Sequence, residues 1–440
     1  MPEEKPVSQT ITATALPPRV LRKTAVATMV GNLIEFYDFN IYGTLSAIVF
    51  GRIFFANLDP VTATFMSLAT FAVGFLARPL GGIVFGHFGD RFGRKPMLVA
   101  SLLTMGGATA LMGLLPTFAA VGWLAPVLLV ALRFVQGLGI GGEWGGAVTL
   151  MLESAPERRR GIFGSVVQSG AGLGIILSTA TVTVLLTTLT PEQMDAWGWR
   201  IPLLLSVALV VVGLIVRSRI EESPEFTAMQ SRSKVARAPL AETLRRHWRM
   251  VLLAIGMYIA IAAFGFTQGV FFTSYLVNTV QLPQSVATTA NLIAAIFYLA
   301  ATFLGGYLSD RIGRIRTYVI GGLVLIPAPF LMFGAGATGS VALIYATMVL
   351  IGLITGTGYG AQASLFFELF PARVRYTGIS LGFQIAAVIG GGLTPLLGAA
   401  LTQATGSTVS ISLYIAVLCV VLVLCTLAAP SIIRKEGNRA

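Results

Sequence analysis

Long apolar segments, separated by short polar turns, recur along the whole chain. Each segment is long enough to cross a hydrocarbon layer of about 30 Å as a helix, and no long polar domain lies between them. The pattern therefore predicts an all-α membrane protein with twelve transmembrane helices. The expected spans are residues 25–50, 62–88, 97–115, 124–152, 161–188, 200–218, 249–278, 285–308, 317–335, 341–369, 376–402 and 407–430.

Two motifs of the first half recur in the second half. GLGIGGEWGGAVTLMLESAPERRRG from Gly137 is matched by GLITGTGYGAQASLFFELFPARVRYTG from Gly352, and GHFGDRFGRK from Gly86 is matched by GYLSDRIGRIR from Gly306. Such repeats predict two pseudo-symmetric six-helix bundles that rock against each other around a site near the membrane midplane. The expected parts are a cytoplasmic tail (1–24), a first bundle (25–218), a cytoplasmic linker (219–248), a second bundle (249–430) and a short cytoplasmic tail (431–440).

The composition agrees with a membrane setting, since 55% of the residues are hydrophobic and 11% are charged, against about 25% charged in soluble proteins. The net charge of +12 does not indicate nucleic-acid binding, because the basic residues fall in alternate short loops and leave no folded basic surface. Among the opposite loops, only Arg52 and Arg200 are basic. The positive-inside rule thus predicts a multi-pass protein of the plasma (inner) membrane with both termini cytoplasmic.

The sequence offers nothing that resembles an enzyme site. Its two histidines are expected at the cytoplasmic face, and its two cysteines, Cys419 and Cys425, lie in the last span, so neither a metal cluster nor a nucleophile with a base is present. A channel would usually show fewer spans, with symmetry between subunits rather than within one chain.

Four charged side chains are expected at similar depths inside the membrane. A rise of about 1.5 Å per residue places Asp38 and Glu143 about 20 Å, Arg78 about 18 Å and Glu35 about 15 Å from the cytoplasmic face. Arg133 is expected about 15 Å below the outer surface by the same rise. Because a charge at such depth costs at least about 2.5 kcal/mol, these residues are expected to be paired or functional.

Glu35, Asp38 and Tyr42 share one face of the first span. A carboxylate in a drying cavity is more readily protonated, and it loses the proton when water or an arginine approaches. Asp38, Glu35 and Glu143 are therefore the proton-coupling candidates. The alternative is a static ion pair, for example between Asp38 and Arg78, or a structural role for Glu143.

The second half offers neutral polar groups rather than charges in its spans, so it is expected to select the substrate by hydrogen bonds. The buried arginines of the first half can each offer five donors and a permanent charge to a carboxylate, which favours a small organic acid. The alternative for each neutral residue is simple helix packing. The candidate substrate-binding residues are Arg78, Arg133, Tyr42, Trp144, Tyr275, Tyr359, Gln362 and Gln384.

The repeated DRxGR loops predict a gate. Their glycine ends a helix at the membrane face, and the aspartate and arginines can reach neighbouring helix ends and separate when the halves move apart. A plain basic turn is the alternative, but it does not explain why the aspartate recurs. The candidate gating residues are Asp90, Arg91, Arg94, Asp310, Arg311 and Arg314.

The two G-x-x-x-D-R-x-G-R loops, RFVQGLGIGGEWGG in the fourth span and EESPEF after the sixth resemble the major facilitator superfamily. GNLIEFYDFNIYG, GFLARPLGGIVFGHFGDRFGRKP, GGEWGGA and VRYTGISLGFQ resemble, more narrowly, its metabolite:proton symporter family over roughly residues 25–430. The resemblance implies two bundles around a cavity lined mainly by helices 1, 4, 7 and 10. It also implies transport, with protons, of shikimate, 2-oxoglutarate, citrate, other organic acids, proline or glycine betaine.

Three departures narrow this resemblance. Osmosensing members carry a long C-terminal coiled-coil extension, whereas this sequence ends at SIIRKEGNRA soon after its last span, so osmosensing is not expected. The Gln-rich signature of sugar porters is missing from the seventh span, FGFTQGVFFTSYLVN. GHFGDR also differs from the more common superfamily loop with Leu and Ser or Ala, so the resemblance does not predict how the gate packs in detail.

We therefore expect a secondary active transporter that imports a small polar metabolite, an organic acid in the favoured interpretation, by proton symport with alternating access. The alternatives are a transporter of proline- or betaine-type osmolytes and a facilitator or exchanger of the same fold. The expected partners are a small-molecule substrate, protons and the lipid bilayer. The chain is expected to act as a monomer, without a cofactor or a metal.

Overall fold

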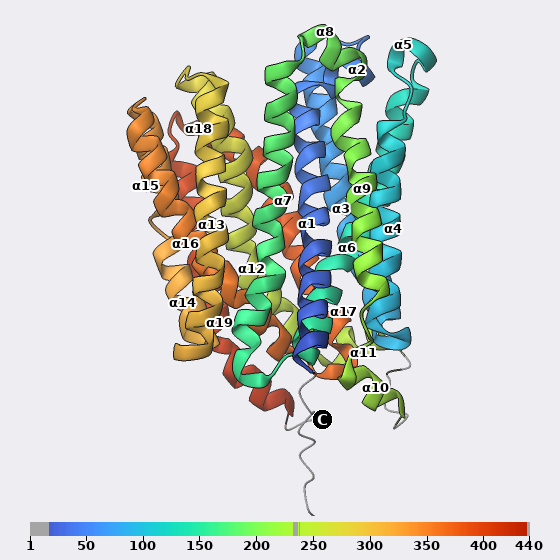
Figure 1. Ribbon diagram of the computed structural model, residues 1–440. Coiled ribbons are helices and arrows are strands. Elements are labelled where there is room, and N and C mark those ends of the chain that lie inside the picture. Colours follow the sequence, from blue (N-terminus) through green and yellow to red (C-terminus); the bar gives the residue numbers. More distant parts are fainter. Residues whose placement is uncertain (1–16, 232–235, 237, 438–440) are drawn as a thin grey trace, which may run out of the picture.

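The computed structural model describes residues 17–231, 236 and 238–437, and this part of the chain forms long helices that run side by side (Figure 1). The first bundle contains α1 (Pro18–Ile48), α3 (Pro60–Phe92), α4 (Arg94–Gly113), α6 (Leu124–Ser154), α7 (Arg160–Thr188) and α9 (Arg200–Ser218). The second contains α12 (Trp248–Phe266), α13 (Gln284–Ile312), α14 (Arg314–Leu325), α15 (Ala328–Ala337), α16 (Val341–Leu369), α17 (Arg375–Ala386), α18 (Thr394–Thr405) and α19 (Val409–Gly437).

Ten helices of the described chain are long and apolar enough to cross a membrane. Two further spans complete the expected twelve. The first is α1, whose hydropathy is lowered by the acids Glu35 and Asp38. The second is the run of α17, the π-helical turn η6 (Ala387–Gly392) and α18, in which the irregular turn interrupts the helix. The expected all-α architecture of two six-helix bundles is confirmed.

Three spans of the second bundle are not continuous α-helices. The seventh span continues from α12 through the π-helical turns η3 (Thr267–Phe272) and η4 (Tyr275–Thr279). The ninth span is broken between α14 and α15 at Pro327, which cannot donate a backbone hydrogen bond. Interruptions of this kind are tolerated in membrane helices where neighbouring helices bury the irregular backbone.

The glycine stripes predicted from the repeats bring helix backbones together. In α6, Gly141 lies directly against the backbone of Arg78 on α3, and in α16, its repeat counterpart Gly356 lies against the backbone of Tyr298 on α13. A Cβ atom at either glycine would collide with the facing backbone, so only glycine permits this approach. The same contact therefore occurs in both bundles.

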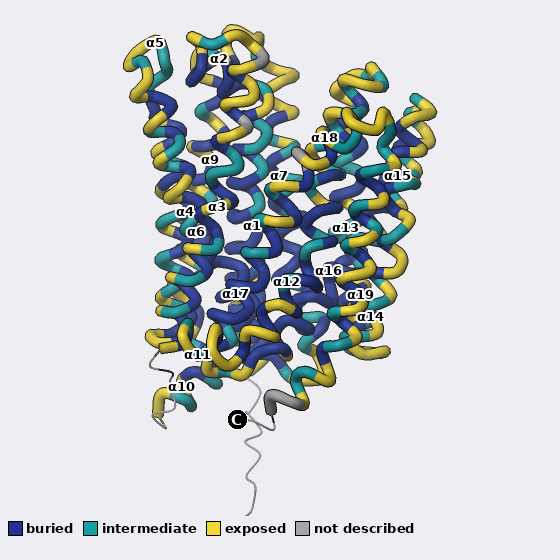
Figure 2. The backbone as a smooth tube through the Cα atoms, turned by 180° about the vertical axis from the view of Figure 1, so that it is seen from behind, coloured by how far each residue is buried: buried dark blue, intermediate teal, exposed yellow. Residues whose placement is uncertain are grey.

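The bundles adjoin at the end of the molecule that carries the α3–α4, α6–α7, α13–α14 and α16–α17 turns, which is called the basic end below. Buried residues gather where the bundles adjoin, toward this end (Figure 2). The α1 helix begins and α19 ends there, and the short helices α10 (Pro224–Ser231) and α11 (Pro239–Arg246) lie across it (Figure 1).

The opposite end carries α2 (Phe50–Phe54), α5 (Phe118–Val121) and α8 (Pro191–Gln193) (Figure 1). A two-pronged contact joins α2 to the π-helical turn η2 (Met194–Gly198), since Arg52 donates to both carboxylate oxygens of Asp195 at 2.8 and 2.7 Å. This hydrogen-bonded carboxylate raises the pKa of Arg52. The contact lies outside the membrane-spanning segments and is largely exposed, so it contributes little to stability.

Candidate functional site between the bundles

Arg78 on α3 makes a polar contact that joins the two bundles. One terminal nitrogen donates to Glu35 on α1 at 2.7 Å, and Nε donates to the side-chain oxygen of Gln384 on α17 at 2.9 Å. Gln384 donates in turn to the backbone oxygen of Gly141 on α6 at 3.1 Å. The guanidinium also lies 5.0 Å from the ring centre of Phe39. Arg78 thus holds an acid of its own bundle and a neutral residue of the other.

Asp38 occupies a separate buried position, one helical turn beyond Glu35. Its carboxylate accepts hydrogen bonds from the hydroxyls of Thr109 on α4 at 2.8 Å and Ser206 on α9 at 2.5 Å. The ion pair suggested for Asp38 and Arg78 is therefore wrong. Arg78 binds Glu35 instead, because Glu35 faces α3 whereas Asp38 faces α4 and α9.

A chain of hydrogen bonds leads from Asp38 to Arg133. Thr109, which donates to Asp38, accepts from the amide of Gln136 at 2.7 Å. The side-chain oxygen of Gln136 accepts in turn from Arg133, three residues earlier on α6. All four side chains are fully buried, and hydrogen bonds in such a setting polarise one another. The charge of Arg133 can therefore affect the protonation of Asp38 without direct contact.

The guanidinium of Arg133 lies among three aromatic rings. Its central carbon is 4.0 Å from the ring centre of Tyr42, 4.9 Å from that of Phe39 and 5.0 Å from that of Phe71. Its Nε and Nη2 atoms have no hydrogen-bond partner among the described residues. These two atoms form one edge of the planar fork, and such an edge matches the two oxygens of a carboxylate. The structure thus shows a buried arginine edge that packs against Gly74 of α3 and has no hydrogen-bond partner among the described residues.

Glu143 on α6 belongs to a different ion pair. One carboxylate oxygen pairs with Arg217 of α9, and the other accepts from Ser101 of α4 at 2.9 Å. Arg217 also donates to the backbone oxygen of Leu98. Gly31 of α1 faces this pair, and a Cβ atom there would collide with both charged groups. The pair is enclosed by four helices of the first bundle.

Aromatic rings from both bundles stack next to the polar groups. Trp144 on α6 stacks on Phe383 of α17 with ring centres 3.9 Å apart, and Phe383 stacks on Tyr258 of α12 at 4.1 Å. The indole N–H of Trp144 donates to Gln168 on α7 at 2.5 Å. Gln168 donates across the interface to the backbone oxygen of Tyr359 at 3.3 Å. Trp144 is thus fixed at the interface by stacking and by hydrogen bonding.

The remaining candidates of the second bundle differ in position. Gln362 on α16 is fully buried, and neither atom of its amide has a partner among the described residues. Tyr359, one turn earlier, is also buried and lies 5.5 Å from Tyr298, ring centre to ring centre. Tyr275 is only half-buried and packs against Phe333 of α15 at 5.5 Å. Tyr275 therefore takes part in the packing of the second bundle.

Two aspartates latch the bundles together at the basic end. Asp90 of α3 accepts from the backbone N–H groups of Tyr376 and Thr377, at 3.2 and 2.9 Å, and from the Thr377 hydroxyl at 2.8 Å. Asp310 of α13 accepts from the backbone N–H groups of Gly161 and Ile162, at 2.7 and 2.9 Å. Each aspartate thus binds the free N–H groups at the start of a helix in the other bundle, where a negative charge is favoured.

Arginines surround these latches. Arg94 pairs with Glu153 on α6 at 3.1 Å, and Arg375 at the start of α17 pairs with the same carboxylate at 3.1 Å. Arg314 pairs with Glu368 in the equivalent position of the second bundle. Arg94 also donates to the backbone oxygen of Ala372 at 3.1 Å, across the interface. The network therefore reinforces the latch on both sides.

Arg91 and Arg311, the other two gating candidates, lie outside the latch. Both are exposed, and each lies over a neighbouring ring of its own helix, Phe92 or Tyr307, at 5.2 Å. At the repeated DRxGR positions, the aspartate and the second arginine face the interface. The first arginine does not, because the helix directs it toward solvent.

Comparison with known proteins agrees with this fold. The model of the Major Facilitator Superfamily matches residues 8–385 and 269–439. The chain belongs to the major facilitator superfamily. It is 38% identical over 423 residues to the shikimate transporter of Escherichia coli (strain K12), covering 95% of each chain. It is 41% identical over 401 residues to the inner membrane metabolite transport protein YhjE of the same organism, covering 90% of each.

Two further members of the superfamily are similar to this chain at lower sequence identity. The chain is 32% identical over 417 residues to the proline/betaine transporter of Escherichia coli (strain K12), covering 91% of this chain and 82% of the relative. Among solved structures, the proton:xylose symporter XylE bound to 6-bromo-6-deoxy-D-glucose matches with a TM-score of 0.77 at 16% identity, covering 94% of this chain and 96% of the other. This last similarity shows the fold. The superfamily member described here is a metabolite transporter of the membrane and not an enzyme.

Several residues of the transporter's buried polar network were missed in the sequence. Arg217 lies at the end of the sixth expected span (200–218), and its long side chain reaches back into the bundle. The available signal was Glu143, a deep acid without a partner in the sequence interpretation. Thr109, Ser206 and Gln136 gave no signal, because isolated hydroxyls and amides in apolar helices are usually satisfied by their own backbone.

Proposed function

We propose that this transporter imports a small organic acid together with a proton. The observation that carries the proposal is the unpaired Nε and Nη2 edge of Arg133, which is connected by hydrogen bonds to the buried carboxyl group of Asp38. A substrate carboxylate at this edge would add a negative charge beside Asp38, and such a charge favours protonation of the acid. Binding of the anion and binding of the proton would therefore support each other.

Arg78 supplies the link to movement in this proposal. Its contacts with Glu35 and Gln384 span the two bundles, so a change in the charge of Glu35 or the arrival of a substrate anion would alter the cross-bundle contact. In the second bundle, Gln362 is the candidate residue for substrate selection, because neither its amide nitrogen nor its amide oxygen has a partner among the described residues. Tyr42, Trp144 and Tyr359 would line the same region.

The proposed setting is the inner membrane, with the basic end and both termini in the cytoplasm. The basic loops support this orientation by the positive-inside rule, and the relative YhjE carries inner membrane in its name. In that orientation the latched structure is closed toward the cytoplasm. Because both bundles belong to one chain, the transporter is proposed to work as a monomer with its protons, its substrate and the bilayer as partners.

Uptake into proteoliposomes tests the proposal directly. An inward proton gradient should drive accumulation of a suitable radiolabelled carboxylate, a protonophore should abolish it, and liposomes without protein provide the background. Competitors should include carboxylates, their matched carboxamides, proline and glycine betaine. We expect carboxylates to compete and carboxamides to fail, because only the charged group pairs with the arginine edge. If the substrate only equilibrates across the membrane, at the same rate with and without a proton gradient, the protein is a facilitator.

An osmolyte transporter is the second candidate, and two observations favour it. Proline/betaine transporters are among the relatives, and the stack of Trp144, Phe383 and Tyr258 lies at the interface. Aromatic faces attract quaternary ammonium groups. Glycine betaine that outcompetes every carboxylate in the same assay would decide for this candidate and against the organic acid.

The latch gives a prediction for Asp90→Asn. The amide replaces one acceptor oxygen with a donor that would face a backbone N–H of α17, and the charge that favours this helix start is lost. We expect the bundles to separate at the basic end in a larger fraction of molecules. Spin labels at the exposed positions Arg158 and Arg316, one in each bundle, should show longer distances.

Arg91→Gln is the matched control, since Arg91 is exposed at the same end and lies outside the latch. It should leave the distance distribution unchanged. If Asp90→Asn also keeps the wild-type distances and normal transport, the aspartate serves topology alone and the gate must lie elsewhere.

A further inference from the structure

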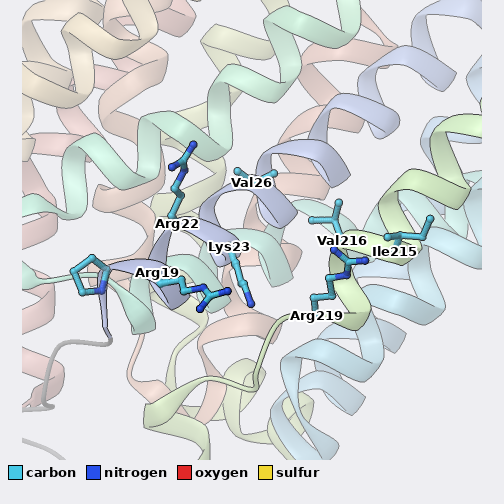
Figure 3. A pocket seen from close by; sticks show the side chains of 8 residues that line it. Arg19, Arg22, Lys23, Val26, Ile215, Val216 and Arg219 are labelled. Atoms are coloured by element: carbon cyan, nitrogen blue, oxygen red, sulfur yellow. The ribbon is translucent and has the colours of Figure 1, made fainter.

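A groove at the basic end has no role in the transport scheme. It runs between the first turns of α1 and the last turn of α9 and has a volume of about 510 Å³ (Figure 3). It lies on the surface of the first bundle, away from the interface between the bundles. Its walls are formed by Pro18, Arg19, Arg22, Lys23, Val26, Ile215, Val216 and Arg219.

The groove carries an uncompensated positive charge. Four of its eight lining residues are basic and none is acidic. Within the described residues, no ion pair is formed by Arg19, Arg22, Lys23 or Arg219. In Figure 3, Arg19 and Lys23 extend from α1 beside the groove, and Arg219 lies on the α9 side. Basic side chains gathered without an acid favour an anionic occupant.

The order of polar and apolar residues along the two helices identifies the kind of anion. On α1, Val26 follows the cations and lies one turn deeper in the span than Lys23. On α9, Ile215 lies one turn deeper than Arg219. Val26 is 39% and Ile215 48% exposed, so an apolar surface continues from the charged rim along the bundle. A free phosphate ion would use the rim alone, whereas a phospholipid would use both surfaces.

We propose that this groove binds an anionic phospholipid, with the phosphate among Arg19, Lys23 and Arg219 and an acyl chain along Val26 and Ile215. The site lies where two membrane-spanning helices reach the basic end, at the depth where lipid headgroups meet juxtamembrane basic residues. The bound lipid would join α1 to α9, which supply Asp38 and its hydrogen-bond donor Ser206. It would therefore stabilise the first bundle whatever substrate the transporter carries.

Photo-crosslinking of the full-length wild-type protein in nanodiscs tests this site without any mutation. The probes are phosphatidylglycerol with a photoreactive group close to the headgroup and the matched phosphatidylcholine. Peptide mapping should place phosphatidylglycerol crosslinks mainly in residues 18–26 and 215–219, and phosphatidylcholine should give far fewer there. Crosslinks spread evenly around the protein, or equal yields from both lipids, would overturn the proposal. Displacement by inorganic phosphate would show a site for the free ion.

Variants then separate charge from apolar contact. Neutralising Arg19, Lys23 and Arg219 to glutamine should lower the crosslink yield by roughly fivefold for each cation removed. The control neutralises Arg158, Arg159 and Arg316, exposed basic residues of the same end that lie outside the groove, and it should keep the wild-type yield.

A second variant avoids any effect of lost charge on insertion. Ile215→Asn keeps all four cations but makes the apolar wall polar, so it should reduce phosphatidylglycerol crosslinking at the groove. An unchanged yield in this variant would contradict the acyl-chain contact and overturn the phospholipid assignment.

Discussion

Asp38→Asn is expected to abolish accumulation of the substrate while exchange across the membrane continues. Asparagine has nearly the shape of a protonated aspartate, and the hydroxyls of Thr109 and Ser206 can act as donors or acceptors toward its amide. The variant should therefore fold and bind substrate in the proton-loaded form. Its asparagine cannot release or take up a proton, so the proton gradient cannot drive substrate accumulation.

The measurement compares counterflow with proton-driven uptake for the purified variant. With one proton moved per substrate, a gradient of one pH unit supports up to about tenfold accumulation, since it corresponds to about 1.4 kcal/mol. We expect the wild type to approach this value and Asp38→Asn to stop at equal concentrations inside and outside. Glu192→Gln, an exposed acid at the opposite end, is the control and should accumulate like the wild type.

Two outcomes would redirect the proposal. Concentrative uptake by Asp38→Asn would clear Asp38 of the proton role and leave Glu35 as the favoured carrier, because Glu35 contacts the cross-bundle arginine. If the variant loses both counterflow and accumulation, Asp38 is needed for binding or folding. A folding check by size-exclusion chromatography separates these two explanations.

Breaking the ion pair of Glu143 and Arg217 is expected to have the largest effect on stability. Arg217→Met leaves the Glu143 carboxylate buried without its partner, and Glu143→Gln strands the guanidinium. Removing one partner of a buried pair costs about 3–5 kcal/mol, because the remaining charge is neither paired nor hydrated. Each single variant should therefore unfold at a clearly lower temperature than the wild type.

The double variant Glu143→Gln with Arg217→Met should recover most of the lost stability, because no charge is left stranded. Arg52→Met provides a matched control, since it breaks an exposed ion pair and should cost at most about 1 kcal/mol. Thermal unfolding in detergent compares these four variants with the wild type. Stability of Arg217→Met equal to the wild type would show that the pair does not hold the bundle together.

Transport by the same double variant decides the role of Glu143. Retained proton-driven uptake would make the pair a structural brace and remove Glu143 from the proton candidates. Loss of accumulation in a stable double variant would restore it as a carrier. Gly31 of α1 lies directly against the Glu143–Arg217 pair. This favours the structural role, because α1 could not move against α6 and α9 without disturbing the pair.

The sequence alone determined the membrane class, the spans and the two-bundle fold. A backbone in lipid must satisfy its own hydrogen bonds, so every long apolar segment becomes a helix whatever its neighbours are. The breaks at Pro327 and at η6 interrupt two spans, but the chain is helical on both sides of each break. The repeated glycines were also readable, because a bare stripe at helical spacing has the same packing consequence in either bundle.

Only the tertiary structure decided which charges meet. Spacing along a helix determines the depth and the face of Glu35, Asp38 and Glu143, and all three were expected at a depth similar to that of Arg78. The direction of each face depends on how the helices are arranged around it, and one turn of α1 separates an acid paired with arginine from an acid held by two hydroxyls. Arg217 reached Glu143 for the same reason, since a long side chain takes its partner from the packing of helices distant in sequence.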